Sequence, residues 1–145
     1  MKKVFFLLSP LLLLVAANAQ ATDTWKLLLN NKVVAQGKSD RVDSSAHLKA
    51  SLLKKTDKIV LTYATTNANS AWNRTFYIND VNDSTMLTLR MNKPAGSVVI
   101  SAATLKNIIA KEKSFYIYTI SLPKDPSLAA RVRVARVLLG KIEWN

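Results

Sequence analysis

The chain contains no cysteine, one histidine and only three glycines among its 145 residues. Without cysteine it can form no disulfide, no thiolate nucleophile and no lipid-modified N-terminal cysteine. Metal sites built from several histidines are excluded, because His47 is the sole histidine. Glycine-rich phosphate loops are excluded too, since Gly37, Gly96 and Gly140 stand far apart. We therefore expect no metal site and no cofactor.

The first 19 residues have the layout of a secretory signal peptide. Two lysines precede an apolar stretch, residues 4–15, and small residues follow it. This stretch is shorter than the roughly 20 residues that a membrane-spanning helix needs. The sequence predicts cleavage before Gln20, with a second small-x-small site before Thr22, and export to the periplasm or the extracellular space.

Removal of residues 1–19 leaves residues 20–145, which are ample for one domain and few for two. No later stretch approaches membrane-spanning length, so we expect no transmembrane segment in the mature chain. Loss of the two leader lysines reduces the net charge from +12 to +10, which still attracts anions over long range. The expected partner of an exported basic protein is an anionic polymer or envelope component, such as lipopolysaccharide or an acidic glycan. Nucleic acid is disfavoured.

Short runs of β-branched and aromatic residues alternate with turn residues, which is typical of antiparallel β proteins. The segment TWKLLLNNKVVAQG predicts a hairpin, because Asn30 and Asn31 tolerate the positive φ of a type I′ turn. Residues 73–80 and 84–92 predict a second hairpin. Residues 114–122 predict a central strand, because both of its faces are apolar or aromatic.

One amphipathic helix is predicted over residues 101–113. Ser101 can cap it, and Leu105, Ile108 and Ile109 share one face. Residues 46–52 alternate apolar and polar side chains and predict a strand, with a short helix as the alternative. The predicted fold is an all-β antiparallel sandwich of about eight strands with one short helix. The alternative is an α+β fold in which an antiparallel sheet packs on that helix.

The segment SAWNRTFYI contains the first group of candidate binding residues. Strand alternation predicts Trp72, Arg74 and Phe76 on one face, where the rings can stack on a sugar and the arginine can bind an anion. The structural alternative places Trp72 and Phe76 in the core and Arg74 at the edge of the sheet.

The second group, Arg131, Arg133 and Arg136, lies in the segment RVRVARVLLG. The preceding DPSLAA is compatible with a helix that begins at Asp125 and Pro126, whereas the three valines that follow favour a strand. These arginines are the best candidates for a basic patch.

Strict alternation along such a strand would bury Arg136, and an unpaired buried arginine is costly. We therefore predict bulges at residues 135–136 and at Gly140 within a bent strand over residues 131–144. The arginines then form a fixed row on one sheet face. The residues predicted on the opposite, inward face are Val132, Val134, Val137, Leu139, Ile142 and Trp144.

A hydrolase that uses His47 is one alternative function, because the segment DRVDSSAHL places aspartates and serines beside the histidine. Nearness in sequence does not assemble a catalytic triad, however, since tertiary geometry must do so. We predict no catalytic residue and expect His47 to face solvent or to be hydrogen-bonded.

Residues 118–144, YTISLPKDPSLAARVRVARVLLGKIEW, resemble the C-terminal part of small exported proteins of unknown function from Bacteroidota-type bacteria. The resemblance implies a bacterial, exported setting and no particular chemistry. The sequence as a whole predicts an exported, non-catalytic β-sandwich that is structural or binds a protein or polymer partner. A basic module that binds an anionic polymer or envelope surface is the main alternative.

Overall fold

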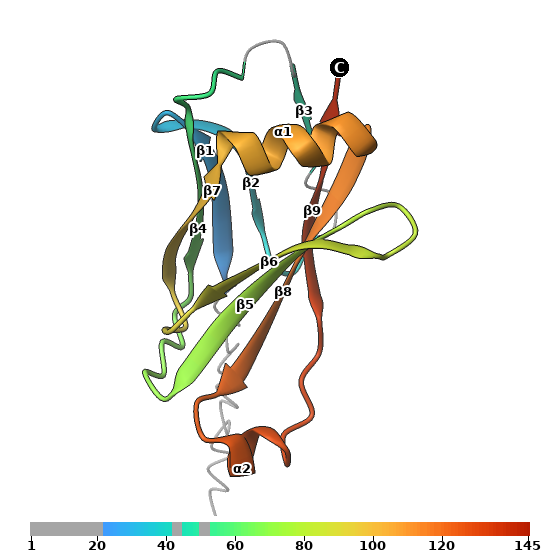
Figure 1. Cartoon of the computed structure of the whole chain (residues 1–145). Coiled ribbons are helices and arrows are strands. Elements are labelled where there is room, and N and C mark those ends of the chain that lie inside the picture. Colours follow the sequence, from blue (N-terminus) through green and yellow to red (C-terminus); the bar gives the residue numbers. More distant parts are fainter. Residues whose placement is uncertain (1–21, 42–44, 50–52) are drawn as a thin grey trace, which may run out of the picture.

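The computed structural model describes residues 22–41, 45–49 and 53–145. In this part of the chain nine strands form two sheets that pack against each other, joined by loops and two short helices (Figure 1). The prediction of an all-β sandwich is confirmed, with nine strands and two helices where about eight and one were expected. The predicted signal peptide, residues 1–19, lies outside the described residues. Neither helix of the described part is long and apolar enough to cross a membrane.

The first sheet has four strands and the second has five. Neighbouring strands are antiparallel except β3 and β9, which run parallel. The first sheet contains, in spatial order, β2 (Lys32–Lys38), β1 (Thr24–Leu29), β4 (Lys58–Ala64) and β7 (Gly96–Ser101). The second contains β3 (Ser45–Leu48), β9 (Val137–Trp144), β8 (Ser114–Pro123), β5 (Trp72–Asn79) and β6 (Thr85–Met91).

The two predicted hairpins are confirmed. Asn30 and Asn31 join β1 to β2 with φ of 49° and 67°, the left-handed conformation that asparagine tolerates. Strand β2 contains a bulge, because Leu27 pairs with Ala35 while Leu28 pairs with Val33. Val34 is therefore the extra residue, and a bulge changes the direction of the side chains around it.

Both sheets contribute their inner faces to one hydrophobic core. Along β4, burial alternates as in a half-exposed strand, with Ile59, Leu61 and Tyr63 inward. Strand β8 lies between β9 and β5, which confirms it as a central strand. The largest fully buried apolar side chains are Trp25, Phe76, Phe115, Ile59, Leu61, Ile78, Leu105, Ile117, Leu139 and Ile142.

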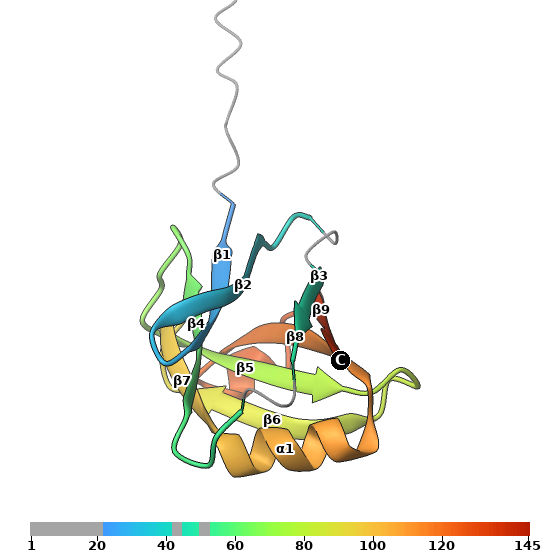
Figure 2. The ribbon, with the colours of Figure 1, turned by 90° about the horizontal axis from the view of Figure 1, so that it is seen from above.

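Helix α1 (Ala102–Lys111) carries the chain from β7 of the first sheet to β8 of the second, across one end of the sandwich (Figure 1). In the view from above, α1 runs from the end of β7 toward β8 (Figure 2). Ser101 caps it as predicted, because its Oγ accepts a hydrogen bond of 3.0 Å from the Thr104 amide. Leu105 and Ile108 are buried on the face toward the core.

The predicted strand over residues 46–52 is confirmed in part. Strand β3 covers Ser45–Leu48 and pairs with β9, whereas residues 50–52 lie outside the described residues.

The predicted strand over residues 131–144 is correct only in its second half. Strand β9 begins at Val137. The short helix α2 (Pro126–Ala129), capped by Asp125, precedes it, and residues 130–136 belong to neither a helix nor a strand. A turn then follows, in which the amides of Arg131 and Val132 donate to the Leu128 carbonyl. The chain rejoins the sheet where Val137 pairs with Thr119.

The two predicted bulges have different outcomes. The bulge at residues 135–136 is wrong, because these residues precede the strand. The bulge predicted at Gly140 lies one residue earlier, since Gly140 pairs with Ile117 while Leu138 pairs with Tyr118, which leaves Leu139 as the extra residue. The inward direction predicted for the C-terminal residues is confirmed for the buried Leu139, Ile142 and Trp144.

Candidate functional site

The first group of candidate residues lies on the inner face of β5. Phe76 is fully buried in the core, and Arg74 is only 7% exposed. Trp72 is half-buried at the start of the strand. The three residues therefore share one face of β5, as strand alternation predicts. That face points inward, between the two sheets, and not toward solvent.

Buried Arg74 has a defined set of partners. Its Nε donates a hydrogen bond of 2.7 Å to the Pro94 carbonyl, and Nη1 lies 3.3 Å from the Thr119 hydroxyl. Its guanidinium lies over the ring of Tyr63, and Nη2 is 4.0 Å from a carboxylate oxygen of Asp23. Burial lowers the pKa of Arg74, while the charge of Asp23 opposes that shift. These contacts compensate the cost of taking the charge out of water.

The second group, Arg131, Arg133 and Arg136, lies in the segment before β9 and is exposed. Arg133 lines a cavity of about 370 Å³ together with Trp72 and Arg74. Arg136 lies elsewhere: its Nη2 is 2.8 Å from an oxygen of Asp83, and its guanidinium carbon is 4.0 Å from the centroid of the Tyr118 ring. The structure thus brings Trp72, Arg74 and Arg133 together and keeps Arg136 apart.

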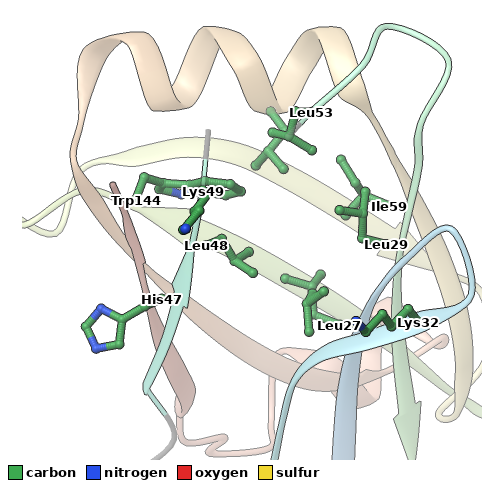
Figure 3. A pocket seen from close by; sticks show the side chains of 11 residues that line it. Leu27, Leu29, Lys32, His47, Leu48, Lys49, Leu53, Ile59 and Trp144 are labelled. Carbon is green, nitrogen blue, oxygen red and sulfur yellow. The ribbon is translucent and has the colours of Figure 1, made fainter. Parts of the chain in front are cut away.

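A different cavity, of about 370 Å³, lies at the opposite end of the sandwich (Figure 3). It lies between the ends of β1, β3 and β9, next to α1. In Figure 3 the side chains of Leu27, Leu29, Leu48 and Ile59 surround a common space. The complete lining consists of Leu27, Leu29, Lys32, Val34, His47, Leu48, Lys49, Leu53, Ile59, Leu105 and Trp144.

Exposed lysines gather at this end of the fold. Lys32, at the start of β2, and Lys49, directly after β3, line the cavity. Asp57 lies in the turn before β4, and its pKa is lowered mainly by a hydrogen bond from Asn30. The positive charges of Lys54 and Lys106 lower it further, so these two lysines lie near Asp57. We call this region the lysine end; it consists of Lys32, Lys49, Lys54, Lys55, Lys58 and Lys106, all of them exposed.

The lysine end has few compensating charges. Asp57 accepts hydrogen bonds from the Asn30 side chain and the Lys54 amide. Within the described part of the chain, no ion pair involves any of the six lysines. The sequence does not predict this region, because its members come from several distant segments. Lysines at the ends of apolar strands, such as Lys32 and Lys58, are the only local signal.

His47 lies at the margin of the cavity, and its side chain is 62% exposed. Its Nδ1 is 3.1 Å from Glu143, which also binds Lys141. The hydrogen bond from Lys141 is the largest cause of the lowered pKa of Glu143. Among the described residues, no hydrogen bond joins His47 to a serine or threonine hydroxyl; Ser44 and Asp43 lie outside them.

The described residues contain no group of three or more histidine, aspartate or glutamate side chains that could hold a metal ion. The chemistry that this end offers is therefore an apolar surface beside a set of cations. Comparisons of the chain with models of protein families, with curated proteins and with solved structures found no match.

Proposed function

We propose that this chain is an exported, non-catalytic binding module that attaches to anionic molecules of the cell envelope through its lysine end. The observation that carries the proposal is the gathering of six exposed lysines at one end of the fold, with Asp57 as the carboxylate beside two of them. Lys32 and Lys49 of this group line the cavity there. Export rests on the predicted signal peptide, residues 1–19.

Charge supplies the attraction in this proposal. The exported chain, with a net charge of +10 after loss of the two leader lysines, draws anions toward it, and a local excess of lysine determines where they bind. Lysine side chains that have no carboxylate partner lose no ion pair when an anion arrives. When their ammonium groups neutralise charges of a polyanion, the counterions condensed on that polyanion are released.

The test measures binding of the purified protein to immobilised lipopolysaccharide and to heparin over a range of salt concentrations. We expect affinity to fall steeply as salt rises, because counterion release gives a linear dependence of log K on log salt. Salt-independent binding, or no binding to either material, would overturn the proposal.

Two double variants locate the site. Lys54→Glu with Lys106→Glu changes the lysine end, whereas Lys93→Glu with Lys124→Glu makes the same change in charge at exposed positions elsewhere. We expect the first pair to reduce the salt slope by about two, one for each lost lysine contact. The second pair should change it much less. Equal losses in the two variants would show that only net charge matters and would contradict a site at the lysine end.

A further inference from the structure

The cavity at the lysine end is lined mainly by apolar side chains, which binding of an anionic polymer alone does not explain. We infer that it takes the hydrocarbon chain of an anionic amphiphile, whose head group binds Lys32 and Lys49 at the rim. This inference rests on the proposed function, since it names the chemical class of the anion. The occupant is a single alkyl or acyl chain that ends in a negatively charged group.

The lining of the cavity is the first support. Eight of its eleven residues are apolar, and none is acidic. The volume of about 370 Å³ lies within the range of about 300 to 1,000 Å³ that is typical of small-molecule sites. Hydrocarbon that enters such a space leaves water, which is the main driving force for apolar association.

The placement of the charges is the second support. Lys32 follows the turn into β2 of the first sheet, and Lys49 follows β3 of the second, so the two lysines flank the cavity from different sheets (Figure 3). Glu143, the carboxylate nearest to His47, is held by Lys141 and His47. The lining therefore presents cations and no anion to an incoming head group, and a neutral head group would gain nothing from Lys32 and Lys49.

The bulge in β2 is the third support. Val34 is the extra residue of this bulge and lines the cavity, whereas the adjacent Val33 is 41% exposed. Of these two neighbouring valines, Val34 is half-buried and lines the cavity, whereas Val33 is exposed and does not line it. They provide a matched pair of positions for testing what occupies it.

The experiment titrates the purified protein with hexyl, octyl and decyl sulfate by calorimetry, below their micellar concentrations. We expect affinity to rise about fifteenfold for every two methylenes, which corresponds to about 0.8 kcal/mol for each methylene removed from water. Octanol should bind at least tenfold more weakly than octyl sulfate. Affinity that does not depend on chain length would overturn the inference, and so would equal binding of octanol and octyl sulfate, the result expected for a site that accepts an apolar peptide side chain.

Variants then show where the alkyl chain of the ligand binds in the protein. Val34→Trp, which fills the cavity, should reduce the affinity for octyl sulfate at least tenfold, whereas Val33→Trp should leave it unchanged. If Val34→Trp fails to fold, Lys32→Gln with Lys49→Gln serves in its place. That pair should bring the affinity for octyl sulfate down toward that for octanol. Unchanged affinity in the folded Val34 variant, or in the lysine pair, would overturn the inference.

Trp144 provides an independent readout, because it lines the cavity while Trp72 lies at the opposite end. The fluorescence change on binding octyl sulfate should disappear in Trp144→Phe and persist in Trp72→Phe. The opposite pattern would mean that the alkyl chain of octyl sulfate binds outside the cavity, and it would overturn the inference.

Heparin separates this inference from the proposed function, because heparin is an anion without a hydrocarbon chain. Salt-dependent binding of heparin with no effect of alkyl chain length would overturn the cavity inference alone. Binding of alkyl sulfates that depends on chain length, without binding of heparin or lipopolysaccharide, would overturn the envelope function alone. If the protein binds neither the anionic polymers nor the alkyl sulfates, the proposed function and the cavity inference are both overturned.

Discussion

The guanidinium carbon of Arg74 lies 3.8 Å from the centroid of the Tyr63 ring. Tyr63 belongs to the first sheet and Arg74 to the second, so this contact bridges the two layers. The Tyr63 hydroxyl in turn donates a hydrogen bond of 2.7 Å to Asp23, just before β1. Burial raises the pKa of Tyr63 and lowers that of Arg74, but an arginine keeps its charge in proteins. One end of the sandwich is thus held together by a compact charged cluster.

The two ends of the molecule differ in how their charges are compensated. Arg74 is surrounded by an aromatic ring, a carbonyl, a hydroxyl and a carboxylate, and these partners use its hydrogen-bonding capacity within the protein. At the lysine end the cations face solvent around an apolar cavity. The end that stabilises the fold and the end proposed to bind a ligand are therefore separate, and substitutions can test them independently.

Replacing Arg74 should destabilise the fold. For Arg74→Ala we expect a loss near the lower end of the roughly 3 to 5 kcal/mol typical of broken buried ion pairs, because the Asp23 side chain is 23% exposed. Arg74→Met should lose less, since its side chain can still pack on Tyr63. Urea unfolding at neutral pH measures both free energies. The exposed Arg90→Ala is the control, and an equal loss in that variant would contradict a stabilising role for the cluster.

Asn30 is expected to stabilise the first hairpin in two ways. Its φ of 49° suits asparagine or glycine, and its side chain binds both Asp57 and the Lys58 amide. Asn30→Gly keeps the backbone conformation and loses only the side-chain hydrogen bonds. Asn30→Ala should be less stable than Asn30→Gly by about 1 to 2 kcal/mol, the cost of the left-handed region.

The same substitutions should also move a pKa. The hydrogen bond from Asn30 is the largest cause of the lowered pKa of Asp57, so both Asn30 variants should raise it toward its ordinary value. A titration followed by carboxyl NMR measures this shift. Asn31→Gly is the control and should leave the pKa of Asp57 unchanged; equal stability of Asn30→Gly and Asn30→Ala would refute the backbone part of the prediction.

Local signals in the sequence predicted the parts of the fold that depend on local interactions. The Asn30–Asn31 turn and the cap at Ser101 need only their immediate neighbours, and both were predicted correctly. The position of Arg74 required more. Alternation along β5 places it inward, but a buried charge is acceptable only with partners, and Asp23 and Tyr63 come from distant parts of the sequence.

The start of β9 and the cavity show the same limit. Alternating arginines and valines predicted a strand from Arg131, yet sheet pairing begins at Val137, because α2 and the turn after it determine where the chain returns to β8. The cavity combines residues of β1, β3 and β9, and no sequence pattern links them. Its existence depends on how closely the two layers meet at that end.

The ion pair between Arg136 and Asp83 should make stability depend on pH. The hydrogen bond from Arg136 is the largest cause of the lowered pKa of Asp83, followed by that from Asn79. A carboxyl with a lowered pKa in the folded state contributes stability above its unfolded pKa of about 3.9, and this contribution disappears as pH falls through the folded pKa.

For Arg136→Gln we therefore expect a stability deficit that is constant above about pH 5 and shrinks as pH falls below about 4. Urea midpoints measured between pH 2 and pH 7 reveal this convergence, and NMR should show a higher pKa for Asp83 in the variant. Arg133→Gln, which removes an exposed arginine outside this pair, should show no such convergence. A deficit of Arg136→Gln that persists unchanged at pH 2 would mean that the ion pair is not its cause.

A side chain at Gly96 should destabilise the protein, and the main reason is the backbone conformation of this residue. Its φ is 141°, a region that residues with a Cβ rarely adopt, and it begins β7, where it pairs with Tyr63. A Cβ at this position would also lie 3.2 Å from the Met91 sulfur. Because methionine is flexible, that crowding can be relieved, whereas the backbone strain cannot.

We expect Gly96→Ala to cost about 1 to 3 kcal/mol, and a double-mutant cycle separates the two causes. If backbone strain dominates, the loss should be nearly the same in the wild-type protein and in a Met91→Ala background, which removes the crowding sulfur. Urea unfolding of the four proteins gives the coupling free energy, which should lie close to zero. A loss that vanishes in the Met91→Ala background would instead show that the sulfur contact, and not φ, requires glycine at this position.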